Sequence, residues 1–179
     1  MVITVVGDYK VCLNEANAFL SVAKSCLGNN ADFLSGKMYP FAVNISFSCE
    51  LYLKAIMIHK SPTNQFCKGH DLKKLFEDLN NCEQNVIETI YKKRCNEPLR
   101  ELLEKNSKAF EQWRYAFQDR VSISVNGMVD FAESLQEYVT TIEANQGLNK
   151  NAARAAAIRT KIRESKPERE RTIETENVG

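Results

Sequence analysis

The segment KGHDLKKLF contains two side chains, His70 and Asp71, that are suited either to proton transfer or to the start of a helix. His70 is one of only two histidines in the chain. An imidazole titrates near neutral pH, so His70 could serve as a general base or acid. Alternatively, Asp71 is a helix N-cap whose carboxylate accepts backbone N–H groups, and His70 only packs against the helix start. The local sequence favours the second interpretation and leaves the first open.

Glu50 and Lys54 form a second candidate pair, in the apolar segment FSCELYLKAI. A glutamate that precedes a lysine by four residues is in the favourable order for an ion pair on a helix. The neighbouring residues are apolar, so both charges are expected to be partly buried, and buried charges need partners. The pair either stabilises the rim of the core or lies in a cleft between helices, with Lys54 available to bind a phosphate.

The segment FEQWRYAFQDR holds a third group of candidates, Trp113, Arg114 and Tyr115. Arginine suits bidentate contact with a phosphate, and aromatic rings stack on nucleic-acid bases. In the alternative interpretation, Trp113 belongs to the core and Arg114 pairs with a carboxylate such as Glu111 or Glu50. The segment therefore predicts either a ligand-binding surface or a structural helix.

Basic residues follow Gly147 and form the fourth group. Residues 1–147 contain 16 Lys/Arg and 18 Asp/Glu, whereas residues 148–179 contain 8 Lys/Arg and 5 Asp/Glu. This tail could bind nucleic acid or an acidic partner, or it could simply be solvated. Its candidate nucleic-acid contacts are Lys150, Arg154, Arg159, Lys161 and Arg163.

Composition narrows the function classes. The net charge of +1 on 179 residues does not by itself imply a nucleic-acid or membrane partner. Six cysteines without a Cys-x-x-Cys pair, together with two histidines, make a zinc site improbable and favour a reducing, cytoplasmic compartment. The chain has no Gly-rich phosphate loop, no Gly-x-Ser-x-Gly and no His-Glu-x-x-His motif, so we expect no cofactor and no metal.

Helices are expected to position these side chains. Four prolines and seven glycines are few, and 44% of the residues are hydrophobic, which favours long helices around a real core. The apolar window 41–59 includes Glu50 and Lys54, so it predicts a buried helix rather than a membrane span. The pattern indicates an all-α, antiparallel, up-and-down bundle of four or five helices, residues 1–147, followed by a basic helical or disordered tail, residues 148–179.

The sequence pattern predicts where individual strands and helices lie along the chain. Two short β-branched runs, at the N-terminus and at residues 121–125, could pair as a small two-stranded sheet. The expected helices cover 13–27, 40–60, a segment from 71 that NNCEQ kinks or splits, a long helix from a cap at Asn96 to Phe117, and 129–142.

Three stretches together resemble the HEPN domain superfamily of prokaryotic and eukaryotic helical domains. They are YPFAVNISFSCELYLKAIM at 39–57, KGHDLKKLFEDL at 68–79 and FEQWRYAFQ at 110–118. The resemblance covers residues 13–143 and implies an up-and-down four-helix bundle that usually dimerises. Many HEPN domains are metal-independent endoribonucleases in toxin–antitoxin, CRISPR-type and phage-defence systems. Others are non-catalytic and bind nucleotides, RNA or a partner nucleotidyltransferase.

The chain departs from the HEPN nuclease motif, which is Arg, four to six residues, then His. No arginine in this sequence is followed by a histidine at that spacing. One hypothesis is a binding protein for RNA or nucleotides in a bacterial defence or toxin–antitoxin setting. A second is a metal-independent endoribonuclease with a composite site, in which His70 activates a ribose 2′-hydroxyl, Arg114 with Tyr115 stabilises charge, and Glu50 and Lys54 orient the site. A third is a non-catalytic partner-binding or dimerisation module.

Overall fold

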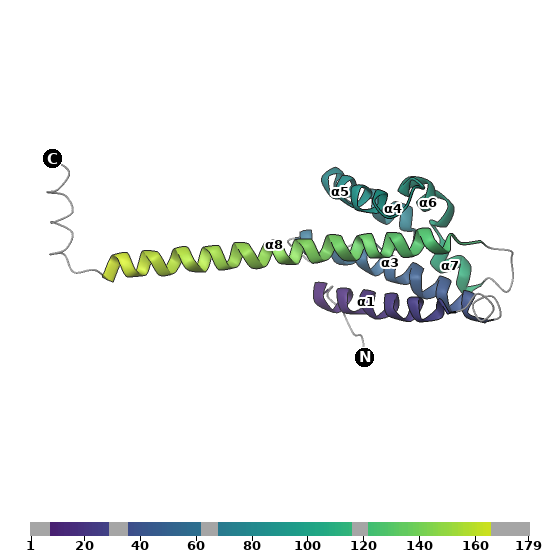
Figure 1. Ribbon diagram of the computed structural model, residues 1–179, viewed down its shortest axis with the longest axis horizontal. Coiled ribbons are helices and arrows are strands. Elements are labelled where there is room, and N and C mark those ends of the chain that lie inside the picture. The colour runs from purple at the N-terminus through teal and green to yellow at the C-terminus, as the bar shows by residue number, and fades with distance from the viewer. Residues whose placement is uncertain (1–7, 29–35, 62–67, 116–121, 166–179) are drawn as a thin grey trace. The chain divides into compact units, whose positions relative to one another are not determined.

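A computed structural model describes residues 8–28, 36–61, 68–115 and 122–165 of the chain (Figure 1). The described residues form seven α-helices and no strand, which confirms the predicted all-α helical bundle. The chain divides into two units inside the last helix, between Val139 and Thr140. The helices are α1 (Tyr9–Cys26), α3 (Met38–Lys60), α4 (Leu72–Glu77), α5 (Asn81–Lys92), α6 (Leu99–Asn106), α7 (Ala109–Arg114) and α8 (Val125–Ser165).

Helix α3 supplies the centre of the first unit. Pro40 lies in its first turn, where the missing N–H of proline costs no helical hydrogen bond. Apolar residues surround the helix on nearly all sides, so α3 buries them against α1, α4 and α7 at once. By length and composition alone α3 could also cross a bilayer, but 72% of its apolar window is buried inside the protein. In this structure these side chains form the core.

The region after α3 is divided by local capping. Asp71 accepts the N–H of Lys74 at 3.0 Å and begins α4 as predicted. Asn80 and Glu83 form a reciprocal capping box that begins α5, so the NNCEQ segment does split the predicted helix. Both boundaries depend on side chains within three residues of the helix start, which explains why sequence reasoning found them.

The predicted long helix from Asn96 is wrong. Pro98 is the N-cap of α6, and the helix is interrupted at Ser107 and Lys108 before α7 begins. The carbonyl of Ser107 accepts the N–H of Leu72, at the start of α4, at 2.7 Å. This contact between segments far apart in the chain holds the interruption against α4, and no local pattern signals it.

The predicted β pairing does not form at its described residues. Residues 122–124 are neither strand nor helix, and Val125 already belongs to α8. The carbonyl of Ser124 accepts the N–H of Met128 at 3.0 Å, so this segment is the beginning of a helix. The N-terminal residues of the proposed pair lie outside the described residues.

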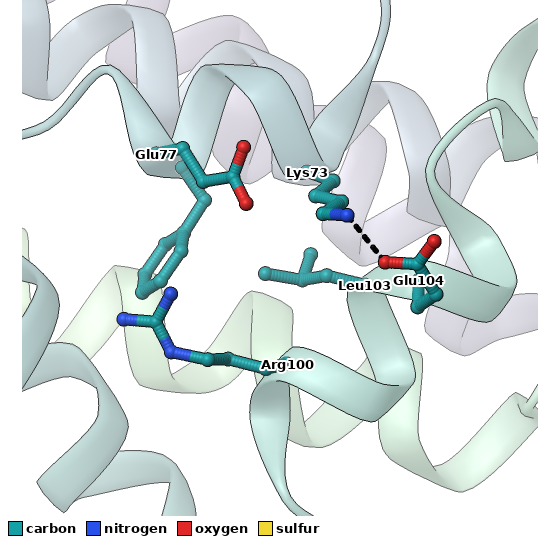
Figure 2. A pocket seen from close by; sticks show the side chains of 6 residues that line it. Lys73, Glu77, Arg100, Leu103 and Glu104 are labelled. Atoms are coloured by element: carbon teal, nitrogen blue, oxygen red, sulfur yellow. Dashed lines mark hydrogen bonds and ion pairs between the residues drawn. The ribbon is translucent and has the colours of Figure 1, made fainter.

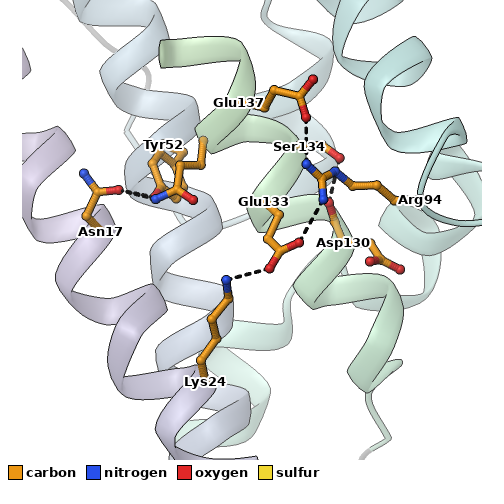
Figure 3. A network of polar contacts seen from close by, with 9 residues as sticks. Asn17, Lys24, Tyr52, Arg94, Asp130, Glu133, Ser134 and Glu137 are labelled. Carbon is orange, nitrogen blue, oxygen red and sulfur yellow. Dashed lines mark hydrogen bonds and ion pairs between the residues drawn. The ribbon is translucent and has the colours of Figure 1, made fainter.

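A polar network joins α1, the turn after α5 and the first part of α8 (Figure 3). Glu133 contacts Lys24 at 2.5 Å and Arg94 at 3.0 Å, and Arg94 also contacts Glu137 at 2.7 Å. Burial raises the pKa of the nearby Asp130 carboxyl, the like charge of Glu133 raises it further, and Arg94 opposes the shift. An ionised Asp130 therefore opposes folding in this network.

Replacing Asp130 by asparagine is expected to increase the free energy of unfolding at pH 7 by on the order of 0.5 kcal/mol. A raised folded-state pKa means that the native state holds the proton more tightly than the unfolded state does. The penalty is therefore present above the folded-state pKa and disappears as pH falls through it, so the gain should shrink at pH 4. Urea unfolding at both pH values measures this. Glu137→Gln, which removes a partner of Arg94, should not stabilise, and a destabilised Asp130→Asn at pH 7 would contradict the prediction.

Candidate functional site

Glu50 is the centre of the candidate site. It lies midway along α3 with 1% of its surface exposed, because apolar residues of the same helix carry it into the core. Its carboxylate accepts a hydrogen bond from Nζ of Lys54, one turn later, at 2.6 Å. The predicted ion pair is therefore present, and it is buried rather than superficial.

His70 completes the buried pair from a different segment. Its Nδ1 lies 3.0 and 2.9 Å from the two carboxylate oxygens of Glu50. A carboxylate only accepts hydrogen bonds, so Nδ1 donates and carries the proton. In the neutral ring, Nε2 then keeps its lone pair, and the side chain is 41% exposed. The arrangement orients an imidazole that solvent can reach.

Gly69 directs the chain into this contact. Its φ is +114°, a conformation that residues with a Cβ rarely adopt. His70 follows directly, and Asp71 then caps α4 with its carboxylate. Asp71 is thus at the helix start, as the structural interpretation predicted, while His70 does more than pack against that start.

Phe110 brings His70 and Arg114 onto one aromatic ring. The His70 and Phe110 ring centroids are 5.1 Å apart, and the Arg114 guanidinium carbon lies 5.0 Å from the Phe110 centroid. The separation of the His70 ring centre and the Arg114 guanidinium carbon cannot exceed the sum of these distances. Arg114 also lies 5.3 Å from the Tyr115 ring and donates to its hydroxyl at 3.1 Å. The structure therefore brings together His70, Arg114 and Tyr115.

The contacts of Arg114 differ from the carboxylate pairing expected of a purely structural helix. Within the described part of the chain it forms no ion pair with Glu111 or with Glu50, and the Glu50 carboxylate instead contacts Lys54 and His70. Arg114 remains exposed on its aromatic neighbours. An exposed guanidinium without a carboxylate is free to bind an anionic ligand.

Trp113 lies in the core rather than on this surface. It is buried, and the centroid of its ring lies 5.4 Å from that of Tyr39. Its Nε1 has no hydrogen-bond partner among the described residues. Tyr39, by contrast, is exposed. A stacking role for this pair would therefore fall to Tyr39.

The sequence interpretation missed Phe110 and Gly69 as parts of the site. Phe110 is one helical turn before Arg114, so a search for aromatic and cationic residues four apart could have found it. Gly69 precedes a helix N-cap, where its role depends on a backbone angle that composition does not reveal. The contact between Glu50 and His70 had no local signal at all.

Cys12 lies near Glu50 and Lys54 but is unsuited to nucleophilic chemistry. Its Sγ donates to the carbonyl of Leu51 at 3.2 Å. Burial raises the pKa of its thiol to about 11, the carboxylate of Glu15 adds to this, and Lys54 opposes it. At neutral pH the thiol stays protonated, and the thiolate is the nucleophilic form. The residues that could move a proton here are those of the Glu50–His70 pair.

The described residues hold no group of three or more His, Cys, Asp or Glu side chains placed to bind a metal ion. The side chains gathered around Phe110 supply an oriented imidazole, a guanidinium and aromatic rings. These groups suit the binding of a phosphate next to a flat base.

A separate cavity of about 250 Å³ lies between α4 and α6 (Figure 2). Lys73 is paired with Glu104 on one side, and the guanidinium of Arg100 lies 6.0 Å from the Phe76 ring on the other. Figure 2 shows Leu103 between these two sides. Three of the four charged groups in its lining have a partner, since Arg100 also contacts Glu88. We assign it no role in the candidate site.

The basic residues of the tail belong to the second unit. Helix α8 continues through this segment to Ser165, and Arg154 is exposed. The side chains of the other four candidate contacts lie outside the described residues: Lys150, Arg159, Lys161 and Arg163.

Comparison with known proteins adds no relative. The chain matches no protein-family model, no curated protein and no solved structure.

Proposed function

We propose that this bundle binds RNA or a nucleotide at the surface of His70, Phe110, Arg114 and Tyr115, which we term the His70 cluster. The observation that carries the proposal is the shared Phe110 ring, which holds an exposed guanidinium and a partly exposed imidazole about 5 Å from its centre. Arginine recognises phosphate, and aromatic rings stack on bases. The resemblance to HEPN domains supports the same class of ligand.

A second candidate function is metal-independent cleavage of RNA at the same surface. The observation that favours it is the contact of His70 Nδ1 with both oxygens of the buried Glu50 carboxylate, which leaves Nε2 as the basic nitrogen. In this mechanism Nε2 takes the proton of a ribose 2′-hydroxyl, and the 2′-oxygen attacks the adjacent phosphorus. The bond from phosphorus to the 5′-oxygen breaks, and the protonated His70 returns the proton to that leaving group.

The products of this step are a 2′,3′-cyclic phosphate and a 5′-hydroxyl end, so no other reactant is needed. Arg114 would stabilise the negative charge that develops on the phosphorane. Glu50 would hold the ring orientation and stabilise the imidazolium, and Lys54 would keep Glu50 in place. The resemblance extends the proposal to a homodimer in a bacterial defence or toxin–antitoxin setting, and the scattered cysteines favour a cytoplasmic location.

Binding is tested by replacing Arg114 with alanine. The affinity for a fluorescent single-stranded RNA, measured by anisotropy, should fall about 10- to 100-fold, because a charge-assisted phosphate contact contributes about 1.5–3 kcal/mol. The dependence of affinity on salt should weaken as well. Arg94→Ala is the matched control, since Arg94 lies outside the cluster and already pairs with Glu133 and Glu137. Equal losses in both variants would refute a role for the cluster.

The same variants separate binding from cleavage. With EDTA present, we compare the wild type, His70→Ala and Arg114→Ala for release of 2′,3′-cyclic phosphate ends. A loss of about 100-fold or more in His70→Ala, with RNA affinity retained, supports cleavage. Equal cleavage by all three proteins removes the catalytic proposal and leaves binding. If the full chain shows no salt-sensitive RNA binding, the third hypothesis, a partner-binding module, is favoured instead.

A further inference from the structure

Two exposed aromatic rings lie beside α7. Among the phenylalanine, tyrosine and tryptophan residues that the structure describes, only Tyr39 and Tyr115 are exposed, at 46% and 50%. Tyr115 follows Arg114 and belongs to the His70 cluster. Tyr39 lies in the first turn of α3, and its ring packs against Trp113 of α7. The two exposed rings therefore contact consecutive residues of one helix, Trp113 and Arg114.

The ring of Tyr39 is held in place although almost half of its surface is exposed. Its centroid lies 5.4 Å from that of Trp113, and the two ring planes meet at 72°, the edge-to-face arrangement that aromatic pairs prefer. Trp113 is only 3% exposed, so the core fixes the partner of Tyr39. A ring that is already ordered loses little conformational entropy when a flat ligand stacks on it. Tyr39 is thus a pre-organised aromatic surface.

The length of α3 sets the distance between Tyr39 and the His70 cluster. Phe47 of α3 stacks on Phe110, the central ring of the cluster, with the two centroids 4.8 Å apart. Residues 39 and 47 are separated by about 12 Å along the helix axis, at about 1.5 Å per residue. Neighbouring bases in one strand of a duplex are only about 3.4 Å apart along the axis. A nucleic acid that reaches both places must therefore be an extended strand whose bases are separated.

A cation precedes each exposed ring by one or two residues. Arg114 donates to the Tyr115 hydroxyl at 3.1 Å, and Lys37, two residues before Tyr39, is the N-cap of α3. Lys37 is exposed and forms no ion pair in the described part of the chain. A ring that stacks on a base, together with a cation that contacts the adjacent phosphate, binds a nucleotide without reading its sequence. The surface holds two such combinations.

We propose that the ligand of this surface is an unpaired RNA strand of at least two nucleotides, with one base stacked on Tyr115 and another on Tyr39. The inference rests on the proposed function, because it extends the His70 cluster by Tyr39 and Lys37. A mononucleotide occupies only one of the two rings. The bases of a duplex are paired and stacked on one another, whereas the bases of a single strand can be splayed onto aromatic side chains.

The test compares three probes on the full chain: a fluorescent RNA strand of eight nucleotides, the same strand annealed to its complement, and AMP as a competitor. The single strand should bind about 10-fold more tightly than either other probe, because each further stacked base adds affinity. The fluorescence of Trp113, the only tryptophan of the chain, should change in parallel, since a base on Tyr39 alters the surroundings of the indole. Equal affinity for AMP or for the duplex, or a constant Trp113 signal, would overturn the inference.

Substitutions of Tyr39 separate stacking from packing. Tyr39→Phe keeps a planar ring and should retain the affinity for the single strand. Tyr39→Leu keeps an apolar cover on Trp113 but removes the ring, so it should weaken binding about 10-fold with an unchanged dependence on salt. Lys37→Gln should make that dependence shallower, because a phosphate contact is lost. Val86→Ala is the control, since Val86 is a comparably exposed apolar residue on α5, and it should bind like the wild type.

The outcomes distinguish this inference from the proposed function. If Arg114→Ala weakens binding while Tyr39→Leu does not, the ligand occupies the His70 cluster alone and only the inference is overturned. If the wild type binds none of the three probes, the proposed function fails and the inference fails with it. If Tyr39→Leu changes the sedimentation of the protein rather than its RNA affinity, Tyr39 belongs to a protein interface and the inference is overturned.

Discussion

Replacing Glu50 by alanine is expected to lower the free energy of unfolding by about 3 kcal/mol, because it removes the carboxylate that the largely buried Lys54 ammonium and the His70 ring contact. Glu50 is 1% exposed, and the side chain of Lys54 is 12% exposed, so water cannot readily replace the lost contact. His70 also loses the group that orients its ring. The midpoint of urea unfolding, compared at constant slope, measures the change.

The matched control is Glu104→Ala. Glu104 also pairs with a lysine, Lys73, but its side chain is 68% exposed. A surface ion pair of this kind contributes at most about 1 kcal/mol, so the control should unfold close to the wild type. Equal costs for the two substitutions would mean that the buried pair at Glu50 does not form in solution.

A double substitution separates the charge from the packing. Glu50→Gln combined with Lys54→Met removes both charges while keeping similar side-chain volumes. It should recover part of the stability lost in Glu50→Gln, because the largely buried Lys54 ammonium that has lost the Glu50 carboxylate is removed as well. The single variant Glu50→Gln also tests function. If it folds, it should keep RNA affinity but lose any cleavage, since the amide cannot stabilise an imidazolium.

Replacing Phe131 by alanine should cost about 3–5 kcal/mol, the range for removing a buried aromatic side chain. Phe131 has no exposed surface and lies in the first part of α8. The centroid of its ring lies 6.3 Å from that of Phe76 in α4 and 6.5 Å from that of Tyr91 in α5, and both ring pairs are edge to face. The substitution therefore opens a cavity where three helices meet, and urea unfolding should show it.

Phe19→Ala removes the same side chain from a half-buried position on α1. It should lower the free energy of unfolding clearly less than Phe131→Ala does, because water already covers part of that ring and the neighbouring side chains can close over the gap. Phe131→Leu should fall between Phe131→Ala and the wild type. If Phe131→Ala cost no more than Phe19→Ala, the packing of α8 against α4 and α5 would be in doubt.

Local chemistry made much of the helix pattern readable. The apolar run of 40–60 predicted the central helix, and Asp71 predicted the start of α4, because a cap acts within three residues. The NNCEQ segment split the predicted helix for the same reason. The predicted uninterrupted helix over 96–117 was wrong because its break depends on a long-range contact. The hydrogen bond between Leu72 and Ser107 joins segments that local patterns treat separately.

The candidate site was predictable as residue types but not as an arrangement. Sequence patterns selected Glu50, Lys54, His70 and Arg114 because charges among apolar neighbours and cations beside aromatic residues are unusual. They could not decide whether Arg114 or His70 would contact the Glu50 carboxylate. That choice depends on the conformation of Gly69 and on where the interruption before α7 places Phe110.

The sequence by itself thus determined the helical class, the central helix and the local caps, because helix periodicity and capping act over a few neighbouring residues. Only the tertiary structure decided that Glu50 and His70, 20 residues apart, share a buried contact, and that Phe110 joins His70 to Arg114. The physical reason is that a buried charge takes whichever partner the folded chain brings within hydrogen-bonding distance. Packing among α3, α7 and the start of α4 sets that partner.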